Sequence, residues 1–191
     1  LYKLLTVTEI MKKTTLITTG ICSLMMLLCV DANAQKFPDL DKSPMDAAWF
    51  PTDYKDSNKI ARVIYSRPQL KGRALTEVVP QGKVWRTGAN EANEISLFTD
   101  MYLGKTKVPA GIYTLYTIPT ENECVIIINK DRNVWGAYTY NEKNDVARLT
   151  VPVTLADEYL EALSMVFTKA DNGTVLNLGW DKVRLAIPFT K

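Results

Sequence analysis

A short segment between two apolar stretches holds the densest group of side chains that could do chemistry. Residues 82–95 read GKVWRTGANEANEI, which places an indole, a guanidinium, an amide and a carboxylate within a few positions. Arg86 can hold a carboxylate or phosphate through two parallel hydrogen bonds. Asn90 can contact a polar ligand, and Glu91 can orient the arginine. Thr87 and Gly88 predict a turn in which Gly88 adopts a positive φ.

A second group of basic residues follows the first predicted strand. Arg67, Lys71 and Arg73 lie in one loop. If that loop packs beside residues 85–91, the guanidinium groups line one cleft suited to an anionic or polyhydroxylated ligand, glycans included. The candidate binding residues are Arg67, Arg73, Trp85, Arg86, Asn90, Glu91 and Trp135. The alternative is that these residues hold loops together, with Trp85 in the core and Arg86 paired with a nearby acid.

Aromatic side chains suggest a second way to bind a sugar. Flat rings stack on sugar faces, but they also supply much of the buried area in small β-domains. Both interpretations stay open for Trp49, Trp85, Trp135, Tyr138 and Tyr140.

The chain contains no histidine, which limits the reactions that it could catalyse. A Ser-His-Asp triad, a histidine base and a histidine-ligated zinc are excluded. A hydrolase would need two carboxylates about 5–9 Å apart, and Glu91 is the candidate centre, with Asp46 or Asp131 as a partner. We therefore expect a non-catalytic binding or accessory module without cofactor or metal. A carboxylate hydrolase and a purely structural role are the alternatives.

Composition narrows the class of partner. The formal net charge of the 191 residues is +2, without the clustered basic excess that nucleic-acid binding requires. Cys124 opens the apolar run CVIII, so we expect a buried and inert thiol.

Residues 11–34 have the three parts of a secretory signal. Lys12 and Lys13 precede an apolar stretch, and Ala32-Asn33-Ala34 provides the small residues of a cleavage site. We expect residues 1–10 to be an upstream extension and cleavage to follow Ala34. The apolar stretch is shorter than the ~20 residues of a membrane span, so we expect no span after cleavage and a periplasmic or secreted protein.

The rest of the chain predicts an all-β, jelly-roll-like antiparallel sandwich of about eight to ten short strands. Residues 35–57 are expected to form an extended arm with one helical turn at Ser43–Asp46, and residues 58–191 the sandwich. Asn172-Gly173 and Asp181-Lys182 predict turns of a three-stranded C-terminal meander. One or two helical turns are expected at residues 155–160. Strands are expected at residues 61–65, 94–98, 101–103, 107–108, 111–118, 124–128 and 148–153.

Several motifs occur together in a recognisable order. They are LDKSPMD at 40–46, YSRP at 65–68 with KGR at 71–73, GKVWRTGANE at 82–91, AGIYTL at 110–115, and NKD at 129–131 with WG at 135–136. In this order they resemble the domain-of-unknown-function family 2911, whose members are exported bacterial proteins. The resemblance covers roughly residues 40 to 188, and it implies export and the fold but no activity.

Overall fold

The structure, a computed structural model, describes residues 6–27 and 35–191. Two compact units, Leu1–Asp39 and Leu40–Lys191, are considered separately. The described part of the first unit contains α1 (Val7–Leu27), and no described helix is both long and apolar enough to cross a membrane. The expected cleavage site after Ala34 lies outside the described residues.

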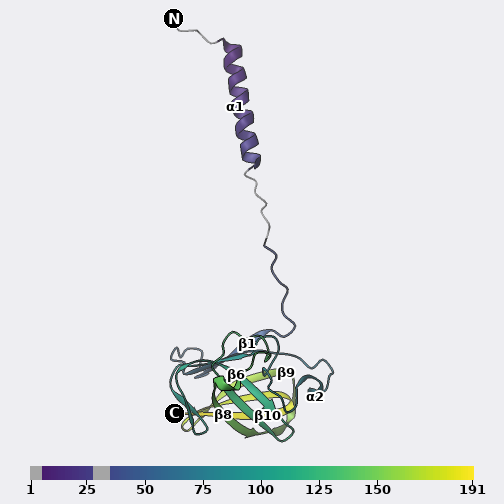
Figure 1. Ribbon diagram of the computed structural model, residues 1–191, viewed down its shortest axis with the longest axis vertical. Coiled ribbons are helices and arrows are strands. Elements are labelled where there is room, and N and C mark those ends of the chain that lie inside the picture. Colours follow the sequence, from purple (N-terminus) through teal and green to yellow (C-terminus); the bar gives the residue numbers. More distant parts are fainter. Residues whose placement is uncertain (1–5, 28–34) are drawn as a thin grey trace. The chain divides into compact units, whose positions relative to one another are not determined.

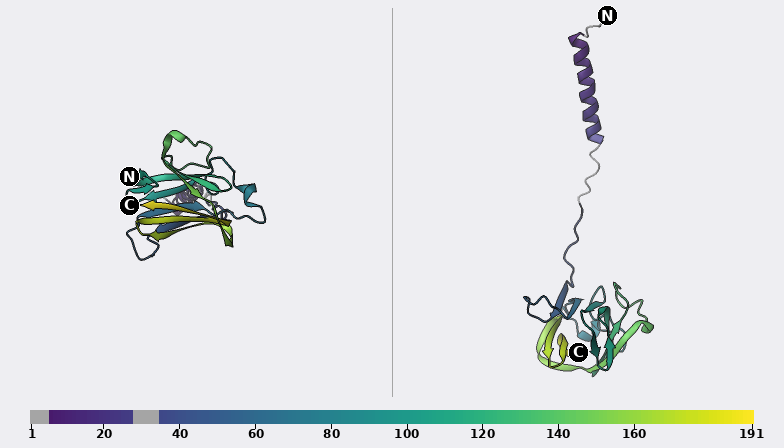
Figure 2. Two further views of the ribbon diagram at one scale, coloured as in Figure 1. Left: turned by 90° about the horizontal axis from the view of Figure 1, so that it is seen from below. Right: turned by 90° about the vertical axis from the view of Figure 1, so that its left-hand side faces the viewer.

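Ten antiparallel strands of the second unit form two sheets that enclose a common core, as Figures 1 and 2 show. The predicted all-β sandwich is confirmed. The first sheet has the order β1 (Met45–Phe50), β2 (Ala61–Ser66), β3 (Asn93–Leu97), β6 (Gly111–Pro119), β7 (Glu123–Asn129), β8 (Asp145–Pro152). The second has the order β5 (Thr106–Val108), β4 (Met101–Leu103), β10 (Gly173–Thr190), β9 (Thr154–Ala170). Two short helical segments, α2 (Leu75–Val78) and the 3-10 turn η1 (Glu142–Asn144), lie between strands.

The core forms because alternate residues of each strand point inward. Ile95 and Leu115 from the first sheet and Leu163 and Phe167 from the second are buried. The predicted alternation of Leu163, Met165 and Phe167 is therefore confirmed, as is the β4–β5 hairpin.

Strand β7 is covered on both faces, as its continuous apolar run predicts. Ile126 and Ile128 belong to the core between the sheets, whereas Ile127 points to the opposite face and is also fully buried. The segment at residues 130–144 lies over that opposite face. There the Tyr140 ring packs edge-on against Tyr116, with 5.3 Å between ring centroids.

The predicted C-terminal meander is wrong, because two long strands replace it. Residues 155–160 belong to β9 and form no helix. The predicted Asn172-Gly173 turn does join β9 to β10, but the chain does not reverse at Asp181. Asp181 adopts a left-handed φ of 53° and lies between two register shifts. A β-bulge bends the strand there while pairing with β9 continues on both sides.

The N-terminal arm also differs from its prediction. The helical turn expected at Ser43–Asp46 is wrong, because β1 begins at Met45 and pairs with β2 along its length. The sandwich therefore starts before residue 58. Pro44 and Pro51 flank this strand, and proline is tolerated there because β1 is at the edge of its sheet.

Candidate functional site

The Trp85 segment is anchored to the middle of the first sheet. The Trp85 amide donates to the Thr117 carbonyl at 2.7 Å, and the Thr117 amide returns a hydrogen bond to Trp85 at 3.0 Å. Trp85 thus pairs with β6 next to the first residue of β3, where β3 itself no longer does. Trp85 is consequently fixed in the core, where it is only 9% exposed.

The turn that follows is held by buried polar contacts. The hydroxyls of Thr87 and Thr117 are 2.9 Å apart, and the side-chain Nδ2 of Asn93 donates to the Thr87 carbonyl at 2.7 Å. The positive φ angles belong to Thr87 (62°) and Asn90 (59°), so the prediction that Gly88 adopts one is wrong. Space at position 88 is tight, because a Cβ there would lie 3.2 Å from both the Ser66 carbonyl oxygen and the Asn93 Oδ1.

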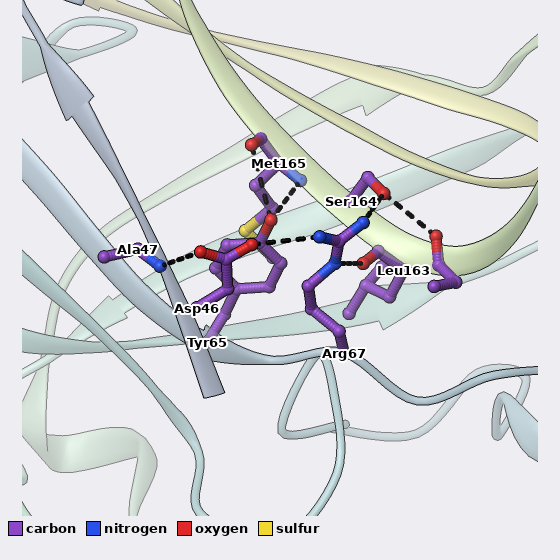
Figure 3. A network of polar contacts seen from close by, with 8 residues as sticks. Asp46, Ala47, Tyr65, Arg67, Leu163, Ser164 and Met165 are labelled. Carbon is purple, nitrogen blue, oxygen red and sulfur yellow. Dashed lines mark hydrogen bonds and ion pairs between the residues drawn. The ribbon is translucent and has the colours of Figure 1, made fainter. Parts of the chain in front are cut away.

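Arg67 connects the two sheets at their β1–β2 edge, as Figure 3 shows. Its Nε donates to the Leu163 carbonyl at 3.1 Å and its Nη2 to the Ser164 hydroxyl at 2.9 Å. Its Nη1 forms an ion pair with Asp46 at 3.0 Å. In the same network the Met165 amide donates to the Tyr65 hydroxyl at 2.9 Å. All of these contacts join parts of the fold, so Arg67 serves as framework.

The other two predicted guanidinium groups bond to nearby carbonyls. Arg73 donates to Leu70 at 2.9 Å and to Gln69 at 2.8 Å, whereas Arg86 donates to Gly88 at 3.2 Å. The three arginines share no partner.

Asn90 and Glu91 lie beside the Trp135 segment because the two backbones pair there. Glu91 forms an isolated bridge with Trp135, and the Gly136 amide donates to the Asn90 carbonyl at 3.0 Å. Both the Glu91 side chain and the Trp135 ring, which is 59% exposed, reach the surface. Among the described residues Glu91 forms no ion pair. These contacts fasten the turn to the segment at 130–144.

The chain has a cavity of about 430 Å³ beside Trp85, at the end of the sandwich near α2. The Trp85 and Trp180 rings stack in its wall, with 6.2 Å between ring centroids and an angle of 9° between the ring planes. Apolar side chains from α2, β9 and β10 supply most of the remaining surface, and hydroxyls and an amide lie among them. The lining residues are Leu75, Thr76, Val79, Gln81, Trp85, Thr87, Thr117, Pro119, Thr120, Glu121, Cys124, Val153, Leu163, Leu178, Trp180, Val183 and Leu185.

The cavity contains few groups that carry charge. Glu121 is exposed and is the single charged residue among the described lining residues, none of which is basic. Cys124 is buried, as predicted, and burial raises the pKa of its thiol to about 12, which favours the neutral thiol. The described residues include no group of three or more acidic or sulfur side chains placed to hold a metal ion.

The Trp85 indole N–H is one of the hydrogen-bond donors in the wall that pair with no described residue. No described residue accepts a hydrogen bond from the Trp85 indole N–H, and this nitrogen is not among the buried polar atoms that lack a partner. It is therefore accessible to solvent. The Trp180 indole, in contrast, donates to the Glu161 carbonyl at 3.0 Å.

Comparison with known proteins places the chain in a protein family. A family model with the description "Protein of unknown function (DUF2911)" matches residues 50–189. The chain belongs to this family. No curated protein and no solved structure matches it. The family match runs from the end of β1 to the end of β10, so it covers nearly all of both sheets but assigns no activity.

In this family member, sequence reasoning identified one cavity residue and missed the rest. Trp85 lines the cavity, whereas Arg67, Arg73, Arg86, Asn90, Glu91 and Trp135 do not. Alternation along β9 and β10 marks Leu163, Leu178 and Leu185 as inward-facing. The alternation of apolar residues could not show that these side chains surround an open space, because strands that line a filled core and strands that line a cavity alternate in the same way.

Proposed function

We propose that this chain is a non-catalytic binding module that holds a small, largely apolar ligand in the cavity beside Trp85. The single observation that carries the proposal is the cavity itself. Its volume of about 430 Å³ is within the range of ligand sites, roughly 300–1,000 Å³. Its wall combines apolar side chains with a few polar groups, which is the usual composition of such sites.

The stacked indoles support this proposal. A close-packed interior leaves few voids larger than a water molecule. An unfilled space between Trp85, Trp180 and Leu178 forgoes dispersion contacts that a ligand would restore. A ligand of matching shape would therefore stabilise the folded state.

We propose export as well. The basic residues Lys12 and Lys13 and the apolar sequence after them support a signal peptide, and a periplasmic or secreted protein follows from cleavage after Ala34. Appearance of a mature chain that begins at Gln35 in the periplasm or medium would test this.

A second candidate is glycan binding at the outer surface. The side chains of Trp135 and Tyr138 are 59% and 82% exposed, and the exposed residue Glu91 pairs with Trp135 through the backbone. Exposed rings of this kind can stack on a sugar face. Binding of an anionic ligand at the surface has less support, because the guanidinium groups of Arg67, Arg73 and Arg86 already form hydrogen bonds within the fold. A hydrolase centred on Glu91 would likewise have to act outside the cavity.

A larger side chain in the cavity wall tests whether the cavity binds the ligand. Val183 lies in the cavity wall and is half-buried, so Val183→Phe adds volume inside the cavity. Val175 is a matched control on the same strand, half-buried and absent from the lining. We expect Val183→Phe to abolish binding of decanol, measured by titration calorimetry, and Val175→Phe to retain it. Equal binding by both variants would place the ligand elsewhere. Binding of soluble oligosaccharides that is lost in Trp135→Ala would favour the surface site instead.

A further inference from the structure

The charges around the cavity indicate which ligands it accepts. This inference rests on the proposed function and concerns the polar end of the ligand. Glu121 lies in the turn between β6 and β7, at the exposed rim of the cavity. The described lining residues provide no lysine or arginine that could neutralise an acid.

A carboxylate in this cavity would lack its usual partner. Burial of an unpaired charge is costly, and a fatty acid needs a cation or several donors to compensate. The Thr87 and Thr117 hydroxyls already bond to each other, and the Thr120 hydroxyl donates to the Glu123 carbonyl at 2.8 Å. An acid would meet the Trp85 N–H, the Thr76 hydroxyl and the Gln81 amide, none of which carries a positive charge, with the Glu121 carboxylate at the rim.

An amine or alcohol fits the same surroundings. An ammonium group at the rim is attracted to Glu121, and a hydroxyl can accept from Trp85 and donate to Gln81 or Glu121. We infer that the cavity selects neutral and cationic apolar ligands over carboxylates, with Glu121 as the residue that sets this preference.

The test compares three ligands that differ only at one end: decylamine, decanol and decanoic acid. Each is titrated calorimetrically into the full chain, and the Val183→Phe titration is subtracted to remove binding at other apolar surfaces, α1 included. We expect about a tenfold preference for the amine over the acid. An exposed ion pair contributes up to about fivefold, and repulsion of the acid supplies the rest. The preference should shrink in high salt because the rim is solvated.

The variant Glu121→Gln isolates the selecting group. It should weaken amine binding by about fivefold, strengthen acid binding, and leave decanol unchanged. Glu123→Gln is the matched control, because Glu123 is an exposed carboxylate two residues away that does not line the cavity. Specific binding in which the acid equals or exceeds the amine, or an amine-to-acid ratio that Glu121→Gln does not change, overturns this inference alone. Absence of Val183-dependent binding for all three ligands overturns the proposed function, and this inference with it.

Discussion

Replacement of Arg67 by methionine separates a structural role from a binding role at one of the seven candidate binding residues. Methionine keeps the aliphatic stem and removes the guanidinium. The Leu163 carbonyl and the Ser164 hydroxyl lose donors at 3.1 and 2.9 Å, and Asp46 loses its ion pair. Hydrogen bonds to charged groups contribute about 1.5–3 kcal/mol each. The lower end applies because the Arg67 side chain is 36% exposed.

The two hydrogen bonds therefore account for a loss of about 3 kcal/mol in the free energy of unfolding, and the exposed Asp46 pair adds under about 1 kcal/mol. Urea denaturation monitored by tryptophan fluorescence measures this loss. Arg73→Met is the control, because Arg73 is exposed and bonds only to carbonyls three and four residues away, and it should cost about 0.5 kcal/mol. A loss for Arg67→Met no larger than the loss for Arg73→Met would refute the framework role.

Further predictions concern one thiol and two hydroxyl groups, those of Cys124, Tyr116 and Tyr140. Because burial raises the Cys124 pKa from 9.0 to about 12, its contribution to stability is complete below about pH 9 and is lost as the pH rises toward 12. At pH 8 iodoacetamide should modify Cys124 only after unfolding, as peptide mass spectrometry of the full chain would show. Rapid modification of the folded chain would contradict its burial. The Tyr116 hydroxyl is buried and forms no hydrogen bond with any described residue, so Tyr116→Phe should leave stability unchanged or raise it by up to about 1 kcal/mol. Tyr140→Phe loses hydrogen bonds with Asp145 and Arg148, so it should lower the free energy of unfolding by about 1–2 kcal/mol in the same urea assay. Equal effects of Tyr116→Phe and Tyr140→Phe would contradict the assigned contacts.

The strands could be predicted because their signal is local. Residues 94–98 and 111–118 alternate with a period of two, and Asn172-Gly173 is a strong hairpin turn, so each could be recognised without knowledge of its partner. Asp181-Lys182 resembles a turn for the same local reasons. It becomes a bulge because β9 is long enough to pair with the chain on both sides, which only the tertiary structure determines.

The site could be predicted less well, because it depends on which loops meet. Arg67 and Arg86 suggested a binding cleft by residue type, but their partners Leu163, Ser164 and Gly88 include carbonyls that no sequence pattern marks as acceptors. Trp85 was recognised as important from its setting in residues 82–95. Its role beside Trp180 depends on a packing contact between residues 95 positions apart in the chain.

A crystal soaked with a bromine-tagged alkyl amine would test the binding cavity most directly, because bromine scatters anomalously and can be located without bias. We predict an anomalous peak between Trp85, Trp180 and Leu178, with the amine directed toward Glu121. Bromine found only at the outer surface, with the space beside Trp85 filled by protein side chains, would contradict the account.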